Sequence, residues 1–283
     1  MTFLRTVRVQ MAACAAMITL AMITWAGSAM ADDGCDAQCQ IARKAQDPLA
    51  NIRALIFDGT VGFDTQRDPL SYATQIQPVY SLPTDGGYNV ILRGTLPVMG
   101  LRNGVVVPPL GSDPRGGSQY DWGVGDTILQ AFFSPKSNGD LKVGFGPQLS
   151  LPTRTNGTFA GPGWGAGVTA VVTGFAGPVS YGAIVGQHWG QDGFSLATLN
   201  PVLMYNTDLF GGTYLGYANT ITHNWQAPSG QRWQVPLGLT FGKTFARPNG
   251  SAVDVNLGLY RLVKRPTGGA ENQLKFAVSL IWP

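Results

Sequence analysis

The feature that most constrains this chain is an alternation of apolar and polar residues with a period of two, which recurs from Ile52 to the C-terminus. The last segment shows it most clearly, where smaller or more polar residues separate Leu274, Phe276, Val278, Leu280 and Trp282. A helix would place its apolar residues three or four positions apart, whereas a strand points alternate side chains to opposite faces. The segments are therefore strands, and runs of about ten alternating residues are typical of a transmembrane barrel.

We expect about twelve strands, plus or minus two. They cover residues 52–63, 72–82, 88–98, 121–134, 140–152, 163–174, 178–189, 194–206, 212–224, 233–245, 251–263 and 272–282. An even number closes an antiparallel up-and-down β-barrel with both termini in the periplasm. The connections agree, because those expected outside, such as 99–120 and 264–271, are longer than inner turns such as 175–177, apart from the short outer connection 190–193. The predicted fold class is all-β, with a short helical segment before the barrel.

Aromatic residues collect at the predicted strand ends. The extracellular ends carry Trp122, Trp164, Trp189, Trp225 and Trp233, and the periplasmic ends carry Trp282, Tyr205, Phe210, Tyr214, Phe245 and Phe175. Two aromatic belts match the two interfaces of a bilayer.

The alternative to a barrel is a soluble β-sandwich, whose strands also alternate apolar and polar residues. Only 12% of the residues are charged, and because the exteriors of soluble sandwiches carry more Lys and Glu, the barrel is favoured.

The N-terminal residues have the features of an export signal. Arg5 and Arg8 precede an apolar stretch over 11–25, and Ala29-Met30-Ala31 fits a signal-peptidase site. The stretch is shorter than the roughly 20 residues of a spanning helix. We therefore expect a cleaved signal peptide over 1–31, an N-terminal segment over 32–50 and an outer-membrane barrel over 51–283.

The segment 32–50 is expected to hold a short helix around 41–45 that ends near Pro48. It either lies in the periplasm or folds into the barrel mouth as a plug, and the sequence leaves both open. Cys35 and Cys39 lie four apart in a chain exposed to an oxidising compartment. We interpret them as structural, with their disulfide left open, since two Cys without a nearby His are poor metal ligands.

Motifs for catalysis and cofactor binding are not found in the sequence. The chain has 2 His, and neither His188 nor His223 has a Cys, Asp or Glu at metal-ligand spacing. We expect no metal, no cofactor and no enzymatic activity. The net charge of +3 gives no reason to expect nucleic acid. A less favoured alternative is a hydrolase at the outer rim that pairs one of these His with a loop Ser.

The functional residues are then expected in the lumen. The inward-facing polar candidates are Asp58, Gln75, Gln77, Arg93, Lys142, Gln148, His188, Asn200, Asp254, Asn256, Tyr260 and Lys275. Both charge signs occur, so strong ion selectivity is not predicted. These residues either line an open path or bond across a filled interior. Candidates for solute contact at the outer rim are Tyr120, Trp122 and Trp164.

Several short motifs, in order, resemble a known family. They are Asp47-Pro48-Leu49-Ala50, residues 92–98, 123–127 and 132–136, Gly144-Phe145-Gly146-Pro147, 151–153, 164–172 and 233–237. The set is similar to the outer-membrane barrels labelled "MetA-pathway of phenol degradation", whose members are often called transporters or, misleadingly, neuromedin U. Residues 32–46 lie outside this likeness. The resemblance implies an outer-membrane barrel associated with uptake of aromatic or other hydrophobic compounds.

The function predicted from these observations is passive passage of small solutes, of the hydrophobic or aromatic class that the resemblance implies. The alternative is a structural or adhesion barrel that acts through its extracellular loops. The expected partners are the outer-membrane lipid bilayer, the solute, and the barrel-assembly machinery, which would engage the C-terminal strand 272–282. The solute and the oligomeric state are not predicted.

Overall fold

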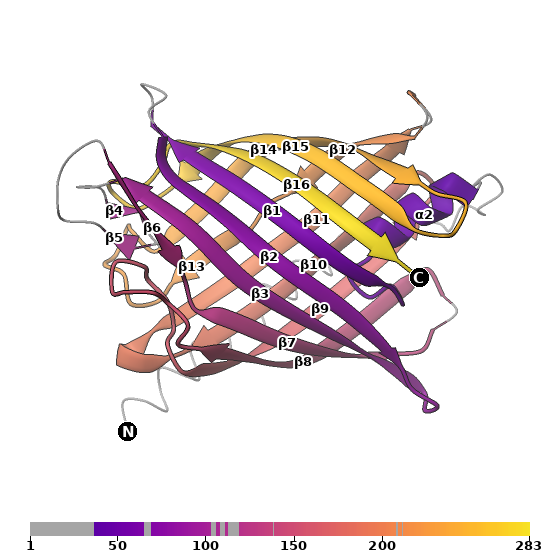
Figure 1. Cartoon of the computed structure of the whole chain (residues 1–283), viewed down its shortest axis with the longest axis horizontal. Coiled ribbons are helices and arrows are strands. Elements are labelled where there is room, and N and C mark those ends of the chain that lie inside the picture. The colour runs from indigo at the N-terminus through magenta and orange to yellow at the C-terminus, as the bar shows by residue number, and fades with distance from the viewer. Residues whose placement is uncertain are drawn as a thin grey trace.

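The computed structural model of the chain describes residues 37–64, 69–102, 106–107, 111–112, 119–137, 139–207, 209–210 and 212–283 (Figure 1). The predicted signal peptide, Cys35 and most of 103–118 lie outside these residues. Cys39 lies in a described helix, but its side chain is not described, so the disulfide stays untested.

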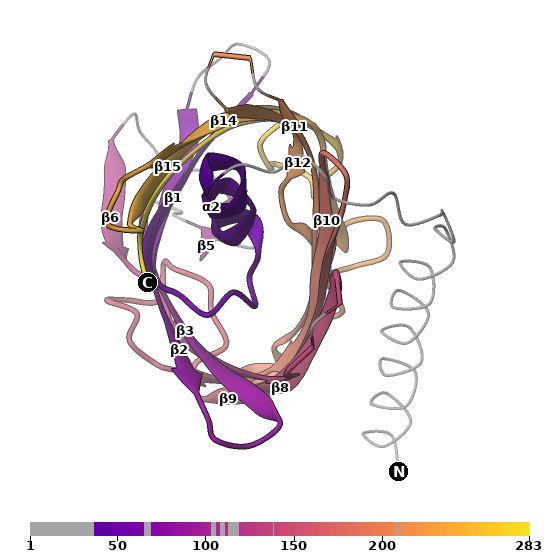
Figure 2. The ribbon, with the colours of Figure 1, turned by 90° about the vertical axis from the view of Figure 1, so that its right-hand side faces the viewer.

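Antiparallel strands form a single sheet that closes on itself. Its segments are β1 (Arg53–Phe63), β2 (Pro69–Pro83), β3 (Tyr88–Arg102), β6 (Tyr120–Val124), β7 (Thr127–Pro135), β8 (Leu141–Leu151), β9 (Gly165–Ala176), β10 (Val179–Trp189), β11 (Ser195–Thr207), β12 (Thr213–Ala218), β13 (Ile221–Asn224), β14 (Trp233–Ala246), β15 (Ala252–Lys264) and β16 (Asn272–Trp282). Successive strands pair, with β6 and β7 both on β3 and with β12 and β13 both between β11 and β14, and β1 pairs with β16 to close the ring (Figures 1 and 2). Among the described residues there are also a small ribbon of β4 (Val106–Val107) with β5 (Gly111–Ser112) and a short 3-10 helix, η1 (Gln191–Gly193).

The segments make 12 barrel strands, because β6 with β7, and β12 with β13, each continue one interrupted strand. The predicted all-β, up-and-down barrel and its strand number are therefore confirmed. The two interruptions fall in 121–134 and 212–224, two of the segments whose alternation is least regular.

At both interruptions, polar side chains form hydrogen bonds with backbone groups where the hydrogen-bond ladder between strands stops. At the β6–β7 break, the Asp126 carboxylate accepts backbone hydrogen bonds from Gly163 at 2.6 Å and Arg154 at 3.2 Å. At the β12–β13 break, the backbone N–H of Ala218 donates to the Tyr260 hydroxyl at 3.1 Å. A buried backbone group needs a partner, and these side chains supply it where the strand ladder stops.

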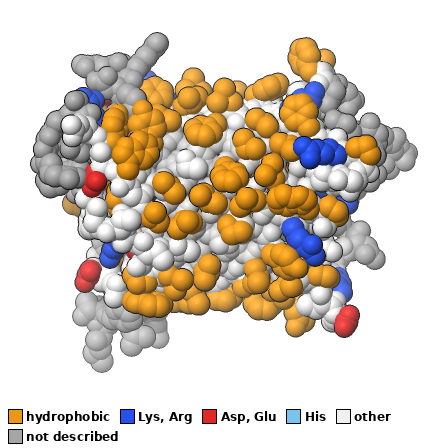
Figure 3. Space-filling view, viewed as in Figure 1, with side chains coloured by type: hydrophobic (Ala, Val, Ile, Leu, Met, Phe, Trp, Pro, Cys, Tyr) orange, Lys and Arg blue, Asp and Glu red, His pale blue; other side chains and the backbone are white. Residues whose placement is uncertain are grey.

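The outer face of the barrel is apolar and the inner face is polar or small. On β14, Leu237, Leu239 and Phe241 are exposed on the outside, whereas Thr240 between them is buried. Hydrophobic side chains cover the middle of the face seen in Figure 3, and charged side chains gather toward its ends. This is the arrangement that a hydrocarbon core imposes on a barrel.

Two residues predicted for the periplasmic belt face the interior instead. Tyr214 is 3% exposed and donates to the Asp254 carboxylate, and the Phe175 ring lies 5.5 Å beneath the Arg43 guanidinium carbon. Their positions in β12 and β9 have inward parity, so the prediction from aromatic type alone was wrong. Trp122 and Trp164 at the other end are exposed, with more than half of each side chain accessible.

One helix precedes the barrel wall. Helix α2 (Ala37–Gln46) lies inside the ring of strands (Figure 2). Its apolar residues Ile41 and Ala45 pack against Ala54, Ala252 and Ile281 of the wall. No helix in the described part of the chain is long and apolar enough to cross a membrane.

Candidate solute pathway in the barrel interior

The N-terminal segment, residues 37–52, is anchored on one side of the interior by α2. Arg43 donates to the carbonyl of Gly177, in the β9–β10 turn, at 2.6 Å. The Gln46 amide donates to Asn206 of β11 at 2.8 Å. Since the apolar side of α2 packs on β15 and β16, the helix connects two parts of the wall.

The same segment then contacts a third part of the wall. Asp47 is buried and forms an ion pair of 2.6 Å with Lys142 of β8. Leu49 packs into a buried cluster with Ile91, Phe132 and Val171, from β3, β7 and β9. The chain then enters β1 at Arg53. The N-terminal segment therefore crosses the interior at its periplasmic half.

Glycine makes room for this crossing. A Cβ placed on Gly144 of β8 would lie 2.9 Å from a Leu49 methyl carbon. Leu49 can approach the wall closely because position 144 carries no side chain. The motif residues 47–50 and 144–147, which are far apart in sequence, therefore meet across the lumen.

A polar layer lies on the wall in the middle of the barrel. Arg93 donates to the Gln77 side-chain carbonyl, and the Gln77 amide donates to Gln75 at 2.6 Å. Lys275 and Asp58, on adjacent strands, form an ion pair of 3.1 Å. Both charge signs are thus paired inside the barrel.

A second polar network lies on the wall formed by β12, β14 and β15. The Asp254 carboxylate accepts hydrogen bonds from Tyr214 at 2.8 Å and Thr244 at 2.7 Å, with Asn256 at 3.5 Å. Two hydroxyl donors satisfy a buried carboxylate without a cation. This network holds three strands in register below the β12–β13 break.

Apolar side chains cover the interior at the extracellular end. Phe159, in the connection 152–164, is fully buried with Met99, Leu101 and Leu262. An added Cβ at Gly123 would lie 2.2 Å from the Phe159 ring. The ring can therefore pack against this strand only because position 123 carries no side chain. The connection is held by an ion pair of 3.5 Å between Arg154 and Asp126. An extracellular connection therefore folds into the mouth of the barrel.

A Ser–His pair is present but lacks the geometry of a nucleophile. His188 Nε2 lies 2.9 Å from the Ser150 hydroxyl, which donates to the Gly163 carbonyl at 2.8 Å. Among the described residues, the buried His188 Nδ1 has no hydrogen-bond partner, so no carboxylate of that part of the chain orients the ring. A general base must accept the proton of the Ser hydroxyl. Here the Ser150 hydroxyl donates its proton in a hydrogen bond to the Gly163 carbonyl instead of to His188. The pair therefore ties β8 to β10.

All twelve predicted lumen residues lie at inward positions of their strands, as the register requires. Their contact with a solute stays a prediction. The rim candidates face outward. Trp122 stacks on Tyr72 with ring centroids 5.6 Å apart, and Tyr120 lies 5.3 Å from the same ring. They form an aromatic cluster on the outer surface at the extracellular end, where Trp164 is also exposed.

Sequence reasoning missed several interior residues. Asp47, Leu49 and Asn206 take part in the crossing, and Asp126 anchors the folded connection. Strand parity would have found Asn206, which shares a face with Asn200. Asp47 and Leu49 belong to a quoted motif, but no periodicity marks residues outside a strand.

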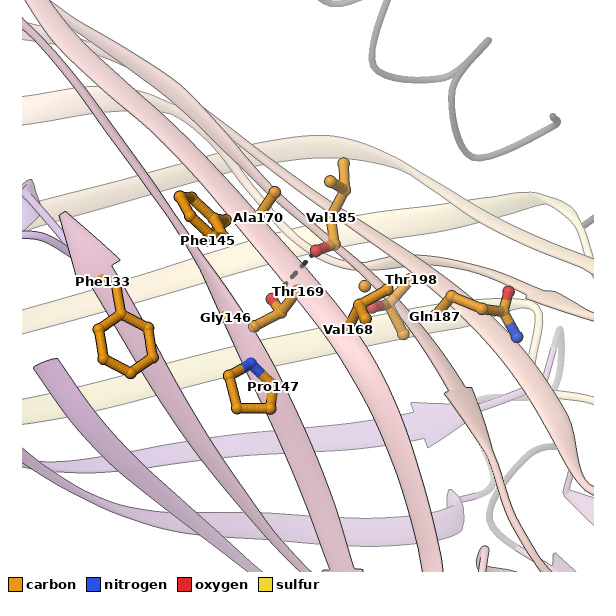
Figure 4. Close-up of a pocket in the computed structure, with 11 residues that line it drawn as sticks. Phe133, Phe145, Gly146, Pro147, Val168, Thr169, Ala170, Val185, Gln187 and Thr198 are labelled. Carbon is orange, nitrogen blue, oxygen red and sulfur yellow. Dashed lines mark hydrogen bonds between the residues drawn. The ribbon is translucent and has the colours of Figure 1, made fainter. Parts of the chain in front are cut away.

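A groove of about 420 Å³ indents the outer wall between β7 and β10 (Figure 4). Phe133, Phe145 and Val168 line it from the outer face, together with Gly146, Thr169 and, on β11, Thr198. Thr169 donates to the Val185 carbonyl at 3.0 Å. The groove is almost wholly apolar and faces the lipid side.

Among the described residues, no cluster of three or more His, Cys, Asp or Glu side chains is placed to hold a metal. The fold, the apolar outer face and the polar interior define a transmembrane β-barrel of the outer-membrane class.

Among solved structures, one fold of this class is similar to that of the chain. The fold is similar to that of the COG4313 outer membrane channel from Pseudomonas putida F1, with a TM-score of 0.54 and 13% identity over 82% of this chain and 94% of that one. A weaker likeness links it to a mutant of the TodX monoaromatic hydrocarbon channel, with a TM-score of 0.38 and 12% identity over 85% and 94%. At these identities the likeness concerns the fold. No family model and no curated protein matches the sequence, so the family resemblance stays a prediction.

Proposed function

We propose that this chain is an outer-membrane channel for passive passage of small solutes. The observation that carries the proposal is that the barrel encloses more space than its own wall side chains fill. A helix of 10 residues and the turn that follows it lie inside the ring. A closed barrel of this strand number is wide enough to hold a ligand or a path once a plug is accommodated.

The solute class that we favour is neutral and partly apolar. Asp58 with Lys275, and Asp47 with Lys142, pair their charges inside the barrel. Paired charges give a pore little preference for either ion sign. The apolar clusters around Leu49 and Phe159 offer surfaces for hydrophobic solutes, and the family resemblance points the same way.

We also propose that residues 1–31 direct export and that β16 engages the assembly machinery.

The test is transport by the exported, full-length barrel in planar bilayers and liposomes. We expect small stepwise conductance and swelling with neutral solutes, with weak preference between cations and anions. Heat-denatured protein provides the control for leakage. The absence of both conductance and swelling, in the native protein and in variants with a loosened N-terminal segment, would contradict the proposal.

A further inference from the structure

A cavity of about 160 Å³ lies between the N-terminal segment and the barrel wall. Its floor is formed by residues 45–48 and 50 of that segment. Most of its wall is apolar, with contributions from Ile56, Val79, Phe132, Ile184 and Val202. The cavity therefore lies in the barrel interior, next to the crossing at Asp47.

Five polar side chains also line this cavity, and three of them have an atom without a partner, whereas Asp47 and Ser279 are not in that group. The Nε of Arg93, the Oδ1 of Asn200 and the Oε1 of Gln46 are buried, and none has a hydrogen-bond partner within the described part of the chain. Buried polar groups are nearly always paired, because an unmade hydrogen bond costs free energy. Three such atoms around one cavity indicate a missing partner.

The volume sets the size of that partner. A dry apolar cavity of roughly 150 Å³ accepts benzene. This cavity of about 160 Å³ therefore accommodates a molecule whose apolar part is about the size of one benzene ring. The apolar wall matches such a body, and a few polar groups fix orientation in typical small-molecule sites.

We propose that this cavity binds a small neutral molecule with a one-ring-sized apolar body and a hydroxyl group. The proposal rests on the channel function and gives its solute class. A hydroxyl accepts from the Arg93 N–H and donates to one amide oxygen.

The same atoms disfavour a carboxylate. Gln46 and Asn200 present acceptor oxygens to the cavity, and the carboxylate-bearing Asp47 lines it as well. A carboxylate accepts only, so it would leave the amide oxygens unpaired beside a second anion. A hydrocarbon without a polar group would leave all three atoms unpaired, which is how polar sites reject such analogues.

The test compares three probes of nearly equal size by fluorine NMR on the full-length barrel in lipid nanodiscs. The probes are para-fluorobenzyl alcohol, para-fluorotoluene and para-fluorobenzoate. We expect saturable binding of the alcohol, and at least about tenfold weaker binding of the other two. Equal saturable binding of toluene and alcohol, or tighter binding of benzoate, would overturn the proposed chemistry.

Two variants and a matched control locate the binding. Val202→Phe fills the cavity and should abolish saturable binding of the alcohol, whereas Val255→Phe, on the lipid-facing side, should leave it unchanged. Asn200→Leu should reduce the preference for alcohol over toluene about tenfold. Unchanged binding in Val202→Phe, with the barrel folded, would overturn the site.

Failure of this inference is distinguishable from failure of the channel. If solute flux and conductance are present but the alcohol shows no saturable binding that depends on Val202, the channel stands and the cavity assignment falls. If flux is absent while binding behaves as expected, the binding site stands and the channel proposal falls.

Discussion

Lys142 on β8 and Asp47 in the N-terminal segment lie 95 positions apart in sequence, yet their charged atoms are 2.6 Å apart. Asp47 is nearly inaccessible, while Lys142 is one-third exposed. This pair, with Leu49 beside it, fixes the turn that crosses the barrel. The position of the N-terminal segment therefore depends on contacts with strands from distant parts of the chain.

Replacing Asp47 with Asn is expected to loosen the crossing. The neutral amide keeps the shape but loses a charged hydrogen bond, which is worth about 1.5 to 3 kcal/mol. Single-channel recording should show larger or more frequent openings. Asp140→Asn, at an exposed periplasmic turn, is the control, and identical currents in both variants would contradict an anchoring role.

Truncating Leu49 to Ala is expected to release the segment without unfolding the wall. The loss of a buried leucine side chain costs about 2 to 5 kcal/mol, and strand pairing does not depend on it. Trypsin should then cleave after Arg43 and Lys44 at least about tenfold faster, since 1.4 kcal/mol is a factor of ten. Leu239→Ala, on the lipid face, should leave the rate unchanged; equal acceleration would indicate general loosening.

Adding a methyl group at Gly123 is expected to displace the folded connection 152–164. The new Cβ would overlap the Phe159 ring and the Thr155 hydroxyl, both 2.2 Å away. Overpacking of this kind costs about 1 to 3 kcal/mol. Faster tryptic cleavage after Arg154 reports the displacement. Gly87→Ala, whose added Cβ would meet no described residue beyond its chain neighbours within 4 Å, should have no effect. An intact connection in Gly123→Ala would contradict the packing described.

Two neighbouring residues on β15 should differ in how much the free energy of unfolding falls when each is replaced by Arg. Leu257 faces lipid and is 55% exposed, whereas Asn256 faces inward near Asp254. Leu257→Arg is expected to lower the free energy of unfolding in liposomes by about 2 to 4 kcal/mol. Asn256→Arg should change it much less, because the guanidinium meets a carboxylate and water. Urea unfolding measures both, and equal losses would argue against the assigned faces.

The places of the barrel strands could be predicted, but not all of their bounds, since β3 continues to Arg102, four residues beyond the expected range 88–98. The expected range 272–282 coincides with β16, and 233–245 differs from β14 by one residue. A lipid-facing strand repeats its pattern every second residue, so local sequence carries the information. The breaks at Gly125 and Asn219 were not predicted, because Asp126 and Tyr260 replace the ladder through contacts with residues distant in sequence.

The aromatic residues show where residue type alone misleads. Trp282 and Tyr205 lie outside, as the belt predicts, but Tyr214 turns inward to Asp254 and Phe175 lies beneath Arg43. Parity decides the face of a strand residue more strongly than its preference for an interface.

The barrel follows from the amino-acid order alone, because alternation is a property of each strand and the bilayer imposes it locally. The crossing of the lumen by residues 37–52, and the polar groups left facing a cavity, follow from how the folded strands come together. The reason is physical: the anchors of that crossing on β3, β8, β9 and β11 become neighbours only when the sheet closes, and no short stretch of chain records which side chains will meet across it.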